Sequence, residues 1–243
     1  LRRRQRQMCI RDSLFMAPGN DVRVASEIAT WMPGYKELSV GKHLFMTIQW
    51  MLSSFANEGK AFFIAIWAAG FLLLMKSKKA KVYQILTVVF SVAAILPYAG
   101  ITFFSEMGIG DIDIEQCLME PPTWQSMTTQ NRIAFFWWIA AVLFTLVLLW
   151  KVTGHSVFIS MVFLGGIASE AVLYFSPTIY ASGARVYYLT DLMYLFIILW
   201  MVMRMDSEKK KNLFIAGAAA LGVINFLLSL IHISEPTRRV VIS

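Results

Sequence analysis

Two short motifs combine a tight turn with an arginine. Residues 15–23 read FMAPGNDVR and residues 175–185 read FSPTIYASGAR, and each presents its arginine where the next helical pattern begins. Proline and glycine impose the reversal, while the N–H groups of a helix start and a guanidinium fork together suit a phosphate. The candidate ligand residues are Asn20, Arg23, Tyr180, Ser182 and Arg185. The alternative is that both motifs are ordinary helix ends, with Arg185 only extending toward lipid headgroups.

Two acids lie inside apolar stretches beside the second motif. Glu170 comes six residues before Ser176, and Asp191 comes six residues after Arg185. If their helices are antiparallel neighbours, both acids lie roughly 9 Å below the same loop, at about 1.5 Å per residue. Carboxyl groups inside a membrane usually face a cavity, a partner charge or the bundle interior. They could support a polar ligand, hold Arg185 or Arg132, or exchange protons; a structural hydrogen bond between helices is the alternative.

Other catalytic or metal-binding patterns are missing from the sequence. It has no Walker loop, no Ser-His-Asp arrangement, no HExxH and no cysteine-rich cluster. The acids of the stretch 105–131 lack the spacing of a calcium loop, so we interpret this stretch as a solvated acidic loop. We therefore predict no metal and no cofactor, and the catalytic residues remain unassigned.

The elements that must carry these residues are apolar helices. Hydrophobic residues make up 58% of the 243-residue chain and charged residues only 15%, whereas a soluble domain has about 25% charged residues. Backbone polar groups in lipid must be satisfied within a helix, and a crossing takes about 18 or more apolar residues. The sequence predicts an all-α, polytopic transmembrane bundle of about six spanning helices. The expected spans are 61–75, 82–104, 133–150, 156–175, 186–203 and 213 to about 231.

The stretch 44–56 is a separate case. Its apolar positions follow helical spacing, but it has only 13 residues. A helix of that length is expected to be interfacial or re-entrant. A full crossing is the alternative.

Loop charge predicts the orientation of the bundle. Nine lysines and arginines lie in the loops 76–81, 151–155 and 204–211, which the positive-inside rule assigns to the cytoplasm. The opposite loops hold most of the acids and are expected outside; they are 14–43, 105–131 and 176–185. Both arginine motifs would then face the extracytoplasmic side.

The two ends of the chain resemble translated sequencing-adapter DNA. Residues 1–13 read LRRRQRQMCIRDS and residues 230–243 read LIHISEPTRRVVIS. The first end has five arginines and one aspartate, and the second has two arginines and one glutamate, so without them the formal charge falls from +7 to +2. We therefore expect residues 14–229 to be a fragment of one transmembrane domain and expect no nucleic-acid partner. A native basic N-terminus beside the membrane is the alternative.

At APGNDVR and SPTIYASGAR the chain resembles an uncharacterised family of multi-pass bacterial membrane proteins. That family is itself similar to the GT-C glycosyltransferases, which use polyprenyl-phosphate sugars on the outer side of the membrane. The resemblance covers roughly residues 14–229. It implies a plasma-membrane protein of the cell envelope that binds a lipid-linked sugar with its outer loops. It also implies a carboxylate base in the first outer loop, and we expect the fragment to be inactive alone.

Two other functions remain open at the level of sequence. A transporter or flippase would line its path with Glu170 and Asp191, so neutralising these acids would abolish substrate movement. A non-catalytic membrane scaffold would tolerate all of the polar substitutions. Whether the chain is an enzyme is undecided, and glycosyl transfer is the activity expected if it is one.

Overall fold

The computed structural model describes residues 20–31, 34–57, 59–75, 77, 80–95, 123–173, 187–220 and 222–223. Within these residues the protein is all-helical and has no strand, as the sequence predicts. The labelled helices are α2 (Asn20–Trp31), the 3-10 helix η1 (Tyr35–Glu37), α3 (Val40–Asn57), α4 (Lys60–Leu74), α5 (Lys81–Ile95), α7 (Thr129–Val152), α8 (Val157–Leu173) and α10 (Tyr188–Met203). A further helix covers residues 208–220.

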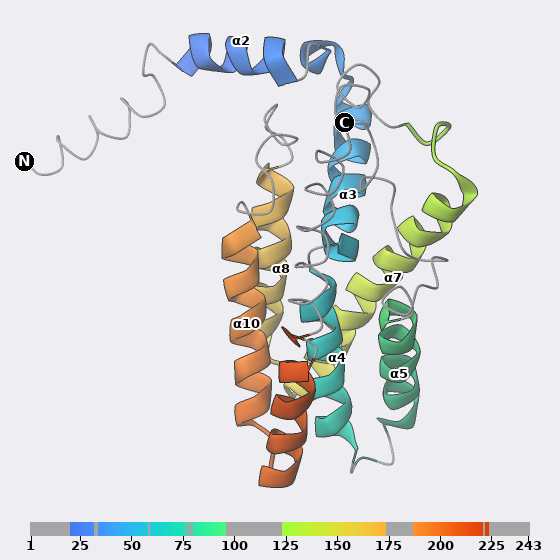
Figure 1. The fold of residues 1–243 in the computed structure, drawn as a ribbon, viewed down its shortest axis with the longest axis vertical. Coiled ribbons are helices and arrows are strands. Elements are labelled where there is room, and N and C mark those ends of the chain that lie inside the picture. Colours follow the sequence, from blue (N-terminus) through green and yellow to red (C-terminus); the bar gives the residue numbers. More distant parts are fainter. Residues whose placement is uncertain are drawn as a thin grey trace, which may run out of the picture.

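Most of the helices run along the long axis of the molecule, while α2 lies across one end (Figure 1). Helix α4 is central, since it packs against α5, α7 and α10. Helices α8 and α10 form an antiparallel pair, and α3 packs against both α7 and α8. The bundle therefore has one end at α2 and the start of α3, and another at the end of α4 and the start of α5 (Figure 1).

The core gathers around α4 because that helix is apolar on every side. Phe63, Ile66 and Trp67 are fully buried on it. The indole Nε1 of Trp67 donates a hydrogen bond of 2.8 Å to Thr145 Oγ1 on α7, which satisfies the polar atom of a large buried side chain. Gly70 lets the same two helices approach closely, since a Cβ there would lie 2.8 Å from Leu148 Cδ2.

Helix α7 has defined stops at both ends. Its N-cap Thr128 accepts a hydrogen bond from the backbone N–H of Asn131 through its side chain, which satisfies one of the free N–H groups of the first turn. After Val152 the chain reverses through Gly154, whose φ of +65° suits glycine. The backbone N–H of His155 then donates to Trp150 O. This turn leads directly into α8.

Helix α3 is longer than the sequence predicts. The expected 13-residue helix at 44–56 is the middle of an 18-residue helix. Its second half is buried from Leu52 to Ala56. It leads after a bend of 68° into α4. The start of α3 could not be recognised from the sequence, because the residues just before Leu44 are polar and the apolar pattern begins at Leu44.

One described helix is long and apolar enough to cross a membrane, namely residues 131–152 of α7, with a mean hydropathy of 2.4. The bent pair α3–α4 meets the same criterion when both helices are taken together. Helices α5, α8 and α10 are apolar but have 15, 17 and 16 residues. Parts of the expected spans, such as 96–104 and 224–231, lie outside the described residues.

Candidate functional site

The centre of the candidate site is a hydrogen bond between two distant helices. Ser54 Oγ on α3 donates to Glu170 Oε2 on α8 at 2.6 Å. Glu170 is 3% exposed and Ser54 is 7% exposed, so the carboxyl group is removed from solvent. This O···O distance is within the normal range of a hydroxyl–carboxyl hydrogen bond. The bond offsets part of the free-energy cost of burying the acid.

Ser54 also lies at the break between α3 and α4. Its backbone carbonyl accepts a hydrogen bond of 2.9 Å from the N–H of Gly59, the residue before α4. A Cβ on Gly59 would lie 3.3 Å from Phe55 Cα, so the chain passes close to its own preceding turn here. The acid is therefore held at a discontinuity in the helical backbone rather than in the middle of a regular helix.

Helix α10 contributes a second hydroxyl group to the same region. Thr190 is 1% exposed, and its Oγ1 lies 2.9 Å from Ser169 Oγ, the residue next to Glu170. Both hydroxyls also lie within hydrogen-bond distance of Gly166 O, at 2.8 Å from Ser169 and 3.2 Å from Thr190. The absence of a side chain on Gly166 permits this close approach, since a Cβ there would lie 3.0 Å from Tyr194 Cε1.

The two sequence-predicted acids lie on helices that pack against each other. Asp191 follows Thr190 in the first turn of α10 and is half-buried. Its carboxyl group is near enough to Glu170 to act on it electrostatically. The condition assumed from the sequence, that the two acids occupy neighbouring antiparallel helices, is met by α8 and α10.

Two further buried hydroxyls have no hydrogen-bond partner within the described part of the chain. Tyr194 is 1% exposed, and its hydroxyl is in electrostatic range of both acids. Thr47, two turns before Ser54 on the same face of α3, is 4% exposed. A buried polar group without a partner is costly, so both hydroxyls are available to a polar ligand. The signal for them in the sequence was weak, because a single Thr or Tyr in an apolar helix is common.

The structure describes the remaining predicted ligand residues only in part. Asn20 and Arg23 lie in the first turns of α2, and their side chains are outside the described set. Tyr180, Ser182 and Arg185 lie outside the described residues altogether. The sequence missed Ser54 and Thr190, which had no motif to mark them.

The contacts that the structure describes for Arg132 are with the loop before α7, whereas the sequence left open a contact with the acids. Arg132 Nη2 donates to the carbonyl oxygen of Trp124 at 3.0 Å and lies 3.4 Å from that of Gln125. The guanidinium carbon lies 5.2 Å from the centre of the Trp124 ring, a cation–π distance. Arg132 therefore fixes the loop before α7.

Comparison with protein-family models, curated proteins and solved structures finds no match to this chain. Within the residues that the structure describes, no group of histidine, cysteine and acidic side chains could hold a metal ion. What the site offers is hydrogen-bonding chemistry: two carboxyl groups and several hydroxyls, enclosed by apolar side chains.

Proposed function

We propose that this chain is part of a multi-span membrane protein that binds a lipid-linked, polyprenyl-phosphate sugar at its extracytoplasmic face. About six helices would cross the bilayer, and the Ser54–Glu170 pair would form the floor of the substrate site. The observation that carries the proposal is the position of this pair beside the end of α8 and the start of α10. The segment that joins these helices holds three of the five predicted ligand residues.

The membrane setting is supported by the outer faces of the helices. Large apolar side chains are exposed along α5, including Val82, Ile85 and Val89. Others are exposed on α8 and α10, such as Phe158, Met161 and Leu199. Contiguous apolar surface of this kind marks a partner or a membrane. Polar groups such as Glu170 and Thr190 are instead buried between helices, the arrangement expected in lipid.

The substrate class is supported by the predicted ligand residues on α2 and in the sequence just before α10. Asn20 and Arg23 lie on α2, which crosses the end of the bundle where α8 stops and α10 begins (Figure 1). Arg185 comes two residues before Tyr187, the N-cap of α10. Two guanidinium groups suit a phosphate, and the acids and hydroxyls below suit the hydroxyl groups of a sugar. Glu170 and Asp191 would support and orient the substrate, while the general base remains unassigned.

A second function, transport of a polar substrate, is favoured by one observation. Broken helices often form the substrate site of secondary transporters, and the α3–α4 pair bends by 68° close to Ser54. The hydroxyls of Thr47 on α3 and Tyr194 on α10, which have no hydrogen-bond partner among the described residues, are two further buried polar groups. In such a protein Glu170 and Asp191 would line the path.

The experiment that tests the proposal uses the full chain in lipid nanodiscs and a short-chain polyprenyl-phosphate sugar as the probe. We expect Arg23→Ala and Arg185→Ala each to weaken binding by about tenfold or more, as loss of a charged hydrogen bond does. Lys36→Ala is the control, since Lys36 is an exposed cation on η1 at the same end. Unchanged binding in both arginine variants would overturn the proposal.

The same preparation separates binding from transport. Reconstituted into vesicles, the Glu170→Gln variant of a transporter would lose substrate movement across the bilayer. A protein that only binds the lipid-linked sugar would show no movement before or after the substitution. A scaffold would show neither substrate binding nor substrate movement, and this result would contradict both proposed functions.

A further inference from the structure

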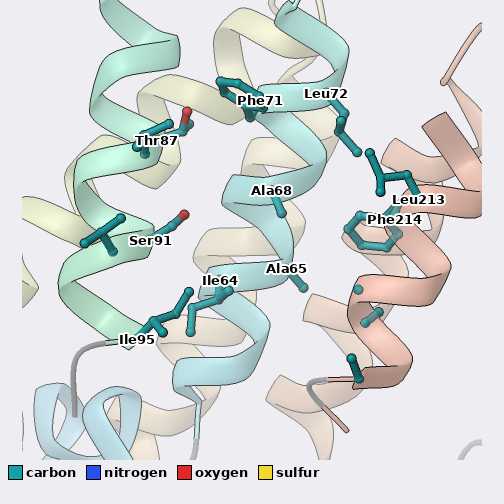
Figure 2. A pocket seen from close by; sticks show the side chains of 15 residues that line it. Ile64, Ala65, Ala68, Phe71, Leu72, Thr87, Ser91, Ile95, Leu213 and Phe214 are labelled. Carbon is teal, nitrogen blue, oxygen red and sulfur yellow. The ribbon is translucent and has the colours of Figure 1, made fainter. Parts of the chain in front are cut away.

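A groove lies along α4, with α5 on one side and helix 208–220 on the other (Figure 2). It encloses about 630 Å³, within the range of about 300–1,000 Å³ that is typical of small-ligand sites. Side chains from all three helices line it, among them Ala68, Phe71, Val92, Leu213 and Phe214. It is separate from the Glu170 site, since none of the residues of that site lines it.

The lining is almost entirely hydrocarbon. Thr87 is one of two hydroxyl residues in it, and its Oγ1 donates to Gln84 O on its own helix at 2.7 Å. The other is Ser91. A polar ligand needs several placed donors or acceptors to offset its desolvation. The groove therefore suits an alkyl chain.

The groove runs parallel to the helices, which is the direction expected for a lipid acyl chain. Its walls run along α4 from Ile64 to Leu72 and along α5 from Thr87 to Ile95. Eight helical steps correspond to about 12 Å. Because α4 and α5 lie along the long axis of the bundle (Figure 1), the groove would run across the bilayer in the proposed membrane setting, as acyl chains do.

Positive charge is concentrated at one end of the groove. Lys210, which precedes the lining residue Leu213 by three positions, donates through Nζ to the backbone oxygen of Leu72 at 2.7 Å. An ammonium group has three donors, so this contact leaves donors for another acceptor. Lys209 is exposed beside it, and Lys81 is exposed at the start of α5. In Figure 1 the end of α4 and the start of α5 lie at the same end of the bundle.

We propose that this groove binds an acyl chain of an anionic phospholipid, and that Lys81, Lys209 and Lys210 hold the headgroup. Charge complementarity selects an anionic headgroup, and the apolar walls select the chain. The proposal rests on the membrane part of the proposed function. It adds a lipid site at the end of the bundle that carries Lys81, Lys209 and Lys210, here called the lysine-rich end. This end is opposite the one proposed for the sugar substrate.

The groove is tested by filling it. Gly217 lines the groove, and a Cβ there meets nothing within 4 Å, so the first atom of the Gly217→Leu side chain has room. Gly222→Leu is the matched control, because Gly222 is equally open but is not a lining residue. The full chain is placed in nanodiscs of phosphatidylglycerol and phosphatidylcholine with the same acyl chains, and retained lipid is measured by native mass spectrometry. We expect Gly217→Leu to retain about tenfold less phosphatidylglycerol, and Gly222→Leu to match the wild type.

The headgroup contact is tested by charge removal. Each lysine near a membrane surface contributes about 1 kcal/mol to the binding of anionic lipid, a factor of about five. We expect the double variant Lys81→Gln and Lys209→Gln to lose most of the preference for phosphatidylglycerol over phosphatidylcholine. Lys36→Gln, at the other end of the bundle, should keep it.

The outcomes separate this proposal from the proposed function. If the wild type inserts into the membrane but Gly217→Leu retains as much phosphatidylglycerol as Gly222→Leu, the groove holds no acyl chain and this proposal alone fails. Occupation of the groove by another segment of the chain would give that same result. If the chain is released from membranes by alkaline carbonate, the membrane setting fails and both proposals fail with it.

Discussion

Ser54 donates a hydrogen bond of 2.6 Å to Glu170 across 116 positions of sequence. The bond joins the end of α3, just before its bend into α4, to the buried face of α8. Thr190 of α10 is hydrogen-bonded to Ser169, next to Glu170, so three helices meet at this acid. A carboxyl group at such a junction is at once a structural tie and a candidate ligand, and the two roles respond differently to substitution.

The structural role predicts a loss of stability when the Ser54–Glu170 hydrogen bond is removed. We expect Ser54→Ala to lower the free energy of unfolding by about 1–3 kcal/mol, because Glu170 would lose its buried donor. In a double-mutant cycle with Glu170→Gln, the two changes should be non-additive, since they affect one contact. The measurement is unfolding of the full chain in mixed micelles. Additive effects would show that the two side chains do not interact.

Close packing of α4 against α7 predicts that one methyl group added at Gly70 lowers the free energy of unfolding. The Cβ of Gly70→Ala would lie 2.8 Å from Leu148 Cδ2 and 3.2 Å from its Cγ, so Leu148 must move. We expect a loss of about 1–3 kcal/mol in the free energy of unfolding, as in other overpacked cores. Gly41→Ala in α3 is the control, because a Cβ there meets nothing within 4 Å. It should be neutral or slightly stabilising, and equal effects at the two glycines would contradict the packing of α4 on α7.

The orientation proposed for the bundle predicts opposite labelling of its two ends. Lys36 lies near α2, and Lys209 lies in helix 208–220 at the lysine-rich end. In a background with Cys9 and Cys117 replaced by serine, a membrane-impermeant maleimide should label Lys36→Cys in intact cells. It should label Lys209→Cys only after the cells are opened. Labelling of both positions in intact cells would contradict a membrane between them.

The apolar character of the helices and the bounds of some of them could be predicted from sequence, while the helices against which they pack could not. Helices α4 and α10 begin and end within two residues of the expected spans, because each coincides with an apolar run of helical length. The start of α3 at Val40 was missed because residues 41–43 are glycine or polar. Their helical state depends on the packing of the rest of α3 against α7 and α8.

Only the charged residues of the candidate site could be predicted from the sequence. Glu170 and Asp191 stand out because acids are rare in apolar helices. Ser54 does not, since a hydroxyl residue in an apolar helix is inexpensive and its partner is distant in sequence. The pair Gly165–Gly166 offered a clue, because small residues allow helices such as α8 and α10 to approach closely. The arginine motifs remain predictions, as their side chains are outside the described residues.

The central claim is that the buried acids form the floor of a substrate site, and equilibrium binding tests it most directly. A short-chain polyprenyl-phosphate sugar is titrated into nanodiscs that hold the wild type, Glu170→Gln, Asp191→Asn or Asp206→Asn. Asp206 is an exposed acid at the lysine-rich end and is the control for loss of one negative charge. We predict binding about tenfold weaker for Glu170→Gln and Asp191→Asn, and unchanged for Asp206→Asn. Equal affinity in all four proteins would mean that Glu170 and Asp191 only tie helices together, and would contradict the proposed site.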